Sequence, residues 1–220
     1  MEINFWEQRW IDNKIAFHQH IINPYLIDYL SNFQLQKQAV VFIPLCGKSL
    51  DIAWFAAQQH SVLGIECSEK AIKDFFKEQE LDAKIEQSKT FTHYKTNNIT
   101  LLHGDFFKLD PQDLKHVDIV YDRASLVALP EDLRQRYVNL LTQALPDKAE
   151  IFLVSLEYNQ TAMSGPPFSV NHNGIIHLFE PDFSVNLLHE CNIIESHLKF
   201  KERGLTYLLE RIYKITRTTS

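Results

Sequence analysis

The part of the sequence that most restricts the fold is the segment from residue 39 to residue 66. An apolar run, residues 39–44, ends in a tight turn at residues 45–47, and a helix-like segment then leads to a second apolar run that closes on Glu66. This is the layout of a nucleotide-binding strand-turn-helix-strand unit, whose turn lets the backbone approach a ligand and whose terminal carboxylate accepts hydrogen bonds from ribose hydroxyls. We therefore predict a nucleotide-binding turn near Gly47.

The composition of that turn indicates which nucleotide it binds. It contains one glycine, Gly47, and follows Pro44, whereas the dinucleotide-binding fingerprint contains three glycines. A pyrophosphate needs several close backbone approaches and a helix N-terminus aimed at it. A ligand that has no phosphate, such as S-adenosylmethionine, needs neither. The turn therefore favours S-adenosylmethionine, with a nucleotide-dependent oxidoreductase on the same unit as an alternative.

Strands and helices alternate along most of the chain, which is typical of a parallel sheet. The predicted strands are residues 39–44, 62–66, 99–102, 117–121, 151–156, 194–201 and 205–215. The last two are joined so closely, at Arg203-Gly204, that they must be antiparallel. We therefore predict an α/β, Rossmann-like fold: a doubly wound, mostly parallel sheet of about seven strands with a C-terminal antiparallel hairpin. This arrangement resembles the class I methyltransferase fold.

The helices are predicted from caps and apolar faces. Ser49 and Ser68 are plausible N-caps, and Pro130 opens a further helix. Other helices are expected at residues 4–12, 24–30 and near 181–190, whereas residues 82–98 form a polar stretch and residues 157–179 lack a clean periodicity. Because long irregular segments in a compact domain are usually functional or disordered, we interpret residues 157–179 as an active-site loop insertion in a single domain, 1–220.

Composition limits the expected partners and location. The chain has a net charge of −6 and no run or helical stripe of Lys and Arg, so nucleic acid is not an expected partner. Its apolar runs are too short for a membrane span, and its acidic N-terminus lacks a signal-peptide pattern, so we expect a cytoplasmic protein without membrane contact. No heptad pattern or exposed helix seam is visible, so a monomer is the default.

Cysteine and histidine usage indicates neither a disulfide framework nor a metal site. Cys46, Cys67 and Cys191 are odd in number, far apart and not in a C-x-x-C motif. The ten histidines are scattered without a metal-binding spacing. We expect reduced thiols and no metal.

Several blocks of the sequence follow one another as they do in a known family. The most specific are residues 44–51, Pro-Leu-Cys-Gly-Lys-Ser-Leu-Asp, and an N-terminal block with Trp6, Trp10 and Phe17-His18-Gln19. Further blocks are Asn23-Pro24 and residues 62–66, 104–107, 121–124, 128–130 and 165–168. Together they resemble the bacterial form of the thiopurine S-methyltransferase family over nearly the full chain. The resemblance implies S-adenosylmethionine as the methyl donor and small thiols, often aromatic heterocycles, as acceptors.

The resemblance also implies donor-binding roles. Glu66 would bind the ribose, the Leu45 backbone would meet the methionine end of the donor, and Trp10 would lie over the donor with its indole N–H aimed at the methionine carboxylate. Residues 1–30 would then be a lid that excludes water from the reacting sulfur. The plain structural alternatives are a surface acid for Glu66 and core packing for Leu45 and Trp10.

Three further donor contacts are implied. Phe106 would pack on the adenine, Asp105 or nearby backbone would meet the adenine amine, and Arg123 would face the donor carboxylate or the acceptor rim. The alternatives are a core phenylalanine, a turn aspartate and a solvated arginine.

Phe17 and Arg203 are implied on the acceptor side, where Arg203 is the candidate catalytic residue. Its charge would favour a thiolate or a purine nitrogen anion, because an opposite charge stabilises the ionised form. An exposed turn residue is the alternative for Arg203, and ordinary core packing is the alternative for Phe17. We expect in-line attack of the acceptor sulfur on the donor methyl group, promoted by alignment and a dry site. No Ser/His/Asp or Cys/His constellation is apparent, and this reaction needs none.

Two other functions stay open at this point. One is a binding module that senses S-adenosylmethionine without turnover. The other is a methyltransferase for inorganic selenium, tellurium or sulfide species, or for another small thiol.

Overall fold

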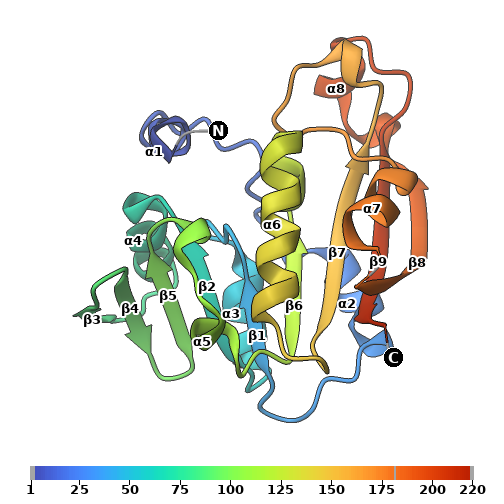
Figure 1. The fold of residues 1–220 in the computed structure, drawn as a ribbon. Coiled ribbons are helices and arrows are strands. Elements are labelled where there is room, and N and C mark those ends of the chain that lie inside the picture. The colour runs from blue at the N-terminus through green and yellow to red at the C-terminus, as the bar shows by residue number, and fades with distance from the viewer. Residues whose placement is uncertain (1–2, 181, 219–220) are drawn as a thin grey trace.

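A computed structural model describes residues 3–180 and 182–218 (Figure 1). Within these residues, nine strands form one sheet in the order β3-β4-β5-β2-β1-β6-β7-β9-β8. The five central strands run parallel, so their carboxyl ends meet at one edge, which is where open α/β sheets bind ligands. They are β1 (Val40–Ile43), β2 (Ser61–Glu66), β5 (Ile99–His103), β6 (Ile119–Arg123) and β7 (Glu150–Glu157).

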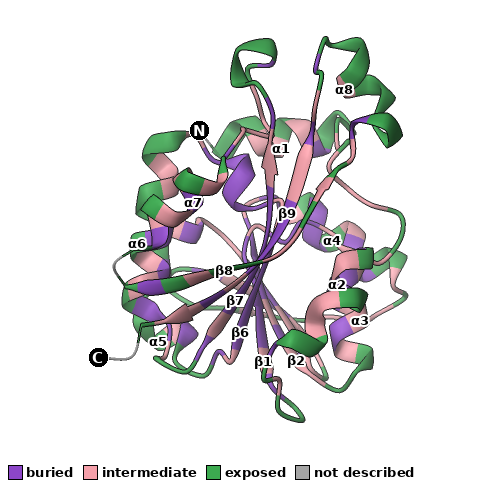
Figure 2. Cartoon of the chain, turned by 90° about the vertical axis from the view of Figure 1, so that its right-hand side faces the viewer, coloured by how far each residue is buried: buried purple, intermediate pink, exposed green. Residues whose placement is uncertain are grey.

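Helices cover both faces of the sheet, and the central strands are buried between them (Figure 2). In β1, Val41 and Ile43 belong to the apolar cluster on one face and Phe42 to the cluster on the other. This alternation explains the continuous apolar runs in the sequence, because a strand covered on both faces has no polar side. The first cluster includes helices α2 (Pro24–Tyr29), α3 (Leu50–Ala57) and α4 (Glu69–Glu78), and the second includes α5 (Pro111–Leu114), α6 (Glu131–Ala144) and α7 (His172–Phe179).

The predicted helix starts are confirmed by their capping hydrogen bonds. The Ser49 side chain accepts from the Asp51 N–H, and the Ser68 side chain accepts from the Ala71 N–H. Each bond satisfies a backbone donor that the first helical turn leaves without an internal partner. Pro130 directly precedes α6, as expected for a residue that tolerates only a helix start.

The predicted number of strands is too low, because residues 82–98 contain the hairpin β3 (Lys84–Gln87) and β4 (Thr92–Thr96). Strand β4 pairs antiparallel with β5, and β3 lies at the sheet edge. Among the side chains of these two strands only Tyr94 is buried, whereas Lys84, Glu86 and Lys95 form ion pairs at the surface. An edge hairpin of this kind lacks an apolar run, so its sequence pattern resembles a loop.

The C-terminal antiparallel pair exists, but the predicted positions of its first strand and of the preceding helix are wrong. Strand β8 (Phe183–Asn192) occupies the region predicted as a helix near 181–190. The region predicted as a strand, 194–201, instead contains η5 (Ile194–Ser196) and α8 (Leu198–Glu202). Strand β8 pairs with β9 (Leu209–Arg217), with a register shift between Leu187 and His189. That shift and the edge position obscure the alternating pattern by which a strand is recognised.

Two short helices stand at the carboxyl edge of the parallel strands (Figures 1 and 2). They are α8 and the N-terminal helix α1 (Ile3–Ile11), whose existence the sequence predicts. Between β7 and β8, the segment 157–179 contains η4 (Gln160–Ala162) and α7, so part of this segment is helical. In the described parts of the chain, no helix is long and apolar enough to cross a membrane. The remaining short helices are η1 (Leu30–Asn32), η2 (Phe106–Lys108) and η3 (Leu126–Ala128).

Candidate active site

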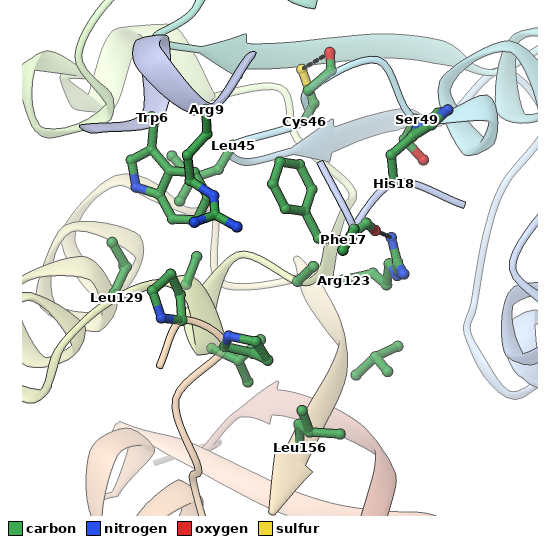
Figure 3. Close-up of a pocket in the computed structure, with 18 of the residues that line it drawn as sticks. Trp6, Arg9, Phe17, His18, Leu45, Cys46, Ser49, Arg123, Leu129 and Leu156 are labelled. Carbon is green, nitrogen blue, oxygen red and sulfur yellow. Dashed lines mark hydrogen bonds between the residues drawn. The ribbon is translucent and has the colours of Figure 1, made fainter. Parts of the chain in front are cut away.

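A cavity of about 610 Å³ lies at the carboxyl edge of the parallel strands (Figure 3). The turns after β1, β5 and β6 and the ends of β2 and β7 contribute lining residues, and α1 and α8 contribute others. All eight residues to which the sequence gives a site role line this cavity: Trp10, Phe17, Leu45, Glu66, Asp105, Phe106, Arg123 and Arg203. The fold thus brings together residues that are spread over almost the whole chain.

Glu66 links the turns that follow β1 and β2. Its carboxylate accepts the Gly47 N–H at 2.9 Å through Oε2 and the Ser68 N–H at 2.8 Å through Oε1. Burial raises the pKa of the Glu66 carboxyl, and the N–H donors of Ser68 and Gly47 oppose that effect. The side chain is only 5% exposed and lines the cavity. A ligand hydroxyl that donates to Glu66 would therefore form its hydrogen bond in a desolvated environment, where such a bond is stronger than in water.

The turn after β1 has an unusual backbone. Leu45 has a φ of 45° and Gly47 a φ of 53°, both in the left-handed region that a leucine rarely adopts. Such a conformation persists only where surrounding contacts hold it, and these positions cluster at ligand sites. The turn therefore presents its backbone to the cavity in a fixed form.

Trp10 covers this turn from the N-terminal segment. The residue is 3% exposed, and a Cβ added to Gly47 would lie 2.8 Å from its Cζ2 atom. The Phe17 ring contacts Trp10 and Trp6 edge to face, with centroid distances of 5.5 Å and 5.6 Å. The segment predicted as a lid thus packs against the turn through aromatic contacts, and Gly47 is the residue small enough to allow it.

Arg123 connects the end of β6 to the same N-terminal segment. Its Nη1 donates to the Phe17 carbonyl at 3.0 Å (Figure 3). The next residue, Ala124, has a φ of 67°, and the Ser125 hydroxyl donates to the Pro44 carbonyl at 2.6 Å. The turns after β1 and β6 are therefore tied to each other.

A buried carboxylate supports the turn after β6. Asp122 accepts the N–H groups of Ser125 and Leu126 at 3.2 Å and 3.1 Å, and the Tyr137 hydroxyl at 2.7 Å. Burial raises the pKa of Asp122 to about 6, although these hydrogen bonds lower it in part. Asp122 therefore positions the residues beside Arg123.

Asp105 and Phe106 follow β5 and line the cavity, but both are also engaged in the structure around it. The Asp105 side chain accepts the Phe107 N–H at 2.9 Å and caps η2. Phe106 is 3% exposed and stacks on Phe42 and Tyr137. Each residue thus also has the plain structural role that its sequence position allows.

Arg203 reaches the cavity from the end of α8, within the connection between β8 and β9. Its Nη1 lies 3.2 Å from the Met163 Sδ, which comes from the segment 157–179. Pro166 and Pro167 of that segment also line the cavity. This side of the cavity is built by long connections, in contrast to the strand-end turns on its other side.

Further charged or titratable residues that the sequence reasoning did not select also line the cavity, among them Arg9, His18, Lys48, Arg136 and Lys199. The sequence signal that could have identified Arg9 as a lining residue is its helical spacing from Trp6. Desolvation, followed by the charge of Lys48, lowers the pKa of His18 and favours its neutral form.

The cavity holds two thiols, and neither is suited to act as a nucleophile. Burial raises the pKa of the Cys46 thiol and of the Cys67 thiol, and the Glu66 charge raises both further. A raised pKa removes the reactive thiolate. Within residues 3–180 and 182–218, no cluster of three or more His, Cys, Asp or Glu side chains could hold a metal ion.

Solved structures with the same fold define the class. A methyltransferase of Anabaena variabilis that depends on S-adenosylmethionine superposes with a TM-score of 0.65 at 14% identity, covering 98% of this chain and 95% of its own. The 1,6-didemethyltoxoflavin-N1-methyltransferase of Burkholderia thailandensis superposes with a TM-score of 0.64 at 14% identity, covering 97% and 87%. The chain therefore has the class I methyltransferase fold.

The family is shown by sequence. The model of the thiopurine S-methyltransferase family matches residues 1–218. The thiopurine S-methyltransferases of Pseudomonas putida and Pseudomonas aeruginosa are 43% and 42% identical over 217 residues, which are 99% of this chain and 100% of each relative. The chain belongs to the thiopurine S-methyltransferase family.

It is accordingly a methyltransferase whose methyl donor is S-adenosylmethionine. The residues present fit this donor. The cavity has the volume of a site for a nucleoside-sized ligand, and the buried Glu66 carboxylate and the left-handed turn at Leu45–Gly47 line it.

Proposed function

We propose that this chain methylates the sulfur atom of small thiols, and that aromatic or heterocyclic thiols such as thiopurines are among its acceptors. The observation that carries the proposal is that one cavity is lined both by the turn after β1 and by an apolar wall that includes arginine side chains. The names of relatives at 42% and 43% identity support the same acceptor class.

On the donor side, Glu66 accepts hydrogen bonds from ribose hydroxyls, while the backbone of Leu45 and the indole of Trp10 hold the methionine end. Asp105 and Phe106 border the adenine. These roles are supported by the position of all five residues on one cavity and by the order of the turns along the sheet edge.

On the acceptor side, Phe17 packs against the ring of the acceptor, and Arg203 stabilises the ionised sulfur. Arg123 donates to the Phe17 carbonyl and so positions this aromatic wall. The aromatic contacts of Phe17 with Trp6 and Trp10 exclude water from the space in which the two sulfur atoms meet.

The reaction needs little from the protein beyond alignment of the acceptor sulfur with the donor methyl group. When bound, S-adenosylmethionine supplies a methyl group that its sulfonium already activates. The residues of this chain align the acceptor, keep the site dry and hold its sulfur as a thiolate through a nearby positive charge. Because the Cys46 and Cys67 thiols are held protonated, the chain itself does not compete as a nucleophile.

The first test is calorimetric titration of the wild type and of Glu66→Ala with S-adenosylhomocysteine. We expect saturable binding to the wild type and a loss of about 10- to 100-fold in Glu66→Ala, the effect of removing hydrogen bonds to a charged group. Thermal unfolding of both proteins controls for the Gly47 and Ser68 N–H groups that the variant leaves unpaired. No binding to the wild type would contradict the assignment of the site.

The second test compares acceptor classes at saturating donor. Turnover of aromatic and heterocyclic thiols supports the proposal, whereas turnover confined to selenite, tellurite or sulfide would replace it. Donor binding without turnover of any of them would favour a sensor. The monomeric state, the cytoplasmic location and the absence of a nucleic-acid partner stay predictions.

A further inference from the structure

The N-terminal segment changes character at Asn23. Among residues 3–22, Trp10 alone is buried. Asn23 is buried, and the helix α2 that follows it packs into the core through Leu26. Segments with few buried contacts open at a lower free energy than the core. The part of the proposed lid that can open therefore ends at Asn23, and α2 belongs to the core.

Two contacts hold residues 3–22 over the cavity. Trp10 packs on Gly47, and the Phe17 carbonyl accepts a hydrogen bond from Arg123. All four of these residues line the cavity. A ligand in the cavity meets the groups that make these two contacts, so the contacts can change as ligands bind and leave.

A third contact lies outside the cavity and joins the end of the segment to the core. The Asp51 carboxylate accepts the Asn23 N–H at 2.9 Å through Oδ1 and the Tyr121 hydroxyl at 3.0 Å through Oδ2. Asp51 is 2% exposed, and neither Asp51 nor Asn23 lines the cavity. Hydrogen bonds to a carboxylate are strong where little water competes for them. We therefore expect this contact to persist whether or not a ligand is bound.

The Asn23 side chain extends this contact in both directions along the chain. Its Nδ2 donates to the Gln19 Oε1 at 3.1 Å, and its Oδ1 accepts the Tyr25 N–H at 3.0 Å and so caps α2. Gln19 is two residues beyond Phe17. Asp51 itself lies in the first turn of α3, directly after the turn that follows β1. Its carboxylate thus joins the end of the lid to that turn and to β6.

We propose that Asp51 is a positioning residue of the active site, which fixes Asn23 as the hinge of the lid. Because this point is held, Trp10 and Phe17 return to the same place over the cavity each time the lid closes. The inference rests on the proposed function, in which these two side chains meet the donor and the acceptor. It assigns Asp51 no contact with either ligand.

A residue of this kind acts through the population of the closed state. Without the Asp51 carboxylate the hinge is not fixed, so the lid occupies its closed position for a smaller fraction of the time. The apparent affinity of a ligand that binds only the closed state falls in proportion to that fraction. Donor affinity and protection of the lid by the donor should therefore fall together.

The experiment follows lid opening by limited digestion with trypsin. The cleavage site is Lys14, whose side chain is 67% exposed, and the cut is detected by mass spectrometry of the fragment that begins at Ile15. The cleavage rate is measured without ligand and at saturating S-adenosylhomocysteine. Calorimetry gives the S-adenosylhomocysteine affinity, and denaturant unfolding gives the global stability of each protein.

The variants separate the hydrogen bonds of Asp51 from the bulk of its side chain. Asp51→Ala removes both acceptors. Asp51→Asn is the conservative variant, because its amide oxygen can accept the Asn23 N–H while its NH₂ group donates to the Tyr121 oxygen. Asp118→Ala is the matched control. Asp118 also accepts a distant backbone N–H, that of Val40 at 2.9 Å, but it lies at the amino end of β6 and does not line the cavity.

We expect S-adenosylhomocysteine to slow cleavage at Lys14 in the wild type. Asp51→Ala should reduce this protection and weaken S-adenosylhomocysteine binding, each by about tenfold, the effect of losing a hydrogen bond to a charged group. Asp51→Asn should stay within about threefold of the wild type in both measurements. Asp118→Ala should lower global stability while keeping the protection and the affinity.

Unchanged protection and affinity in Asp51→Ala, or equal losses in Asp118→Ala, would overturn the inference, because Asp51 would then have a structural role only. Equal losses in Asp51→Asn would also overturn it, since the hydrogen bonds would not be the cause. A wild type that binds S-adenosylhomocysteine without slower cleavage would overturn the hinge and leave the proposed function intact. Failure of the wild type to bind S-adenosylhomocysteine would instead contradict the proposed function.

Discussion

The proposed donor half and the proposed acceptor half of the cavity are built in different ways. The donor half consists of short turns at the ends of buried parallel strands, with backbone groups bonded to the Glu66 and Ser125 side chains. The proposed acceptor half is lined by Phe17, by the segment 157–179 and by the end of α8, which lie far apart in the sequence. In that half, Arg203 donates to the Met163 sulfur, so the group beside it comes from another long connection.

The proposed division explains how one fold can hold the same donor while the acceptor varies. Turns at strand ends inherit the rigidity of the sheet, so a few side chains suffice to fix the donor. Long connections carry no such constraint, and their residues can change without disturbing the sheet. Substitutions in the donor half should therefore affect stability and donor affinity together, whereas those in the acceptor half should affect acceptor binding alone.

The largest expected effect concerns the buried carboxylate of the donor half. Asp122 has a pKa raised to about 6 from an ordinary value of 3.8. Between these values the native state holds a proton that the unfolded state has lost, so this group lowers stability as pH rises through the interval, by about 3 kcal/mol in total. We expect Asp122→Asn to lack this loss. The difference between the free energies of unfolding of wild type and variant, measured with denaturant, should therefore change by about 3 kcal/mol between pH 4 and pH 7. A difference that is the same at both pH values would contradict it.

Gly47→Ala should break the donor half next. The substitution places a Cβ 2.8 Å from Trp10 at a φ of 53°, so we expect about 2 kcal/mol less stability and roughly tenfold weaker S-adenosylhomocysteine binding. Gly204→Ala is the matched control, because Gly204 has a φ of 89° and open space around its Cβ position. It should show the backbone strain without the loss of binding. If both variants lost binding equally, the contact with Trp10 would not be the cause, and a role of Trp10 in donor binding would be contradicted.

Arg203→Ala tests the acceptor half. We expect the KM for an aromatic thiol to rise about tenfold and the rising limb of the rate to move to higher pH, because the lost charge no longer favours the thiolate. S-adenosylhomocysteine affinity, measured by calorimetry, should stay within about twofold of wild type. Arg203→Lys should recover part of the effect. An unchanged rate with an unchanged pH dependence would remove Arg203 from the mechanism.

Ser125→Ala gives the smallest expected effect and sharpens the comparison. It removes the 2.6 Å hydrogen bond that ties the turn after β6 to the Pro44 carbonyl. We expect a loss of about 1 kcal/mol in the free energy of unfolding, together with weaker donor binding. Acceptor KM at saturating donor should not change. If the acceptor KM changed and the donor affinity did not, the proposed division of the cavity would be wrong.

Much of the donor half could be predicted from the sequence, because its signals are local. The apolar runs of β1 and β2, the caps at Ser49 and Ser68, and Glu66 at a strand end lie within one short segment. Their meaning depends on neighbours a few residues away. The parallel direction of the central strands is predicted from the helices between them, and the structure confirms it.

The sequence by itself thus determined the α/β class, the position of the turn after β1 and the family. Only the tertiary structure decided the edge hairpin β3–β4, the strand β8 in place of a helix, and the placement of Arg9 inside the cavity. The physical reason is that edge strands are defined by backbone hydrogen bonds to distant partners, and the role of a charged side chain depends on which groups the fold leaves beside it. Neither quantity is contained in a window of neighbouring residues.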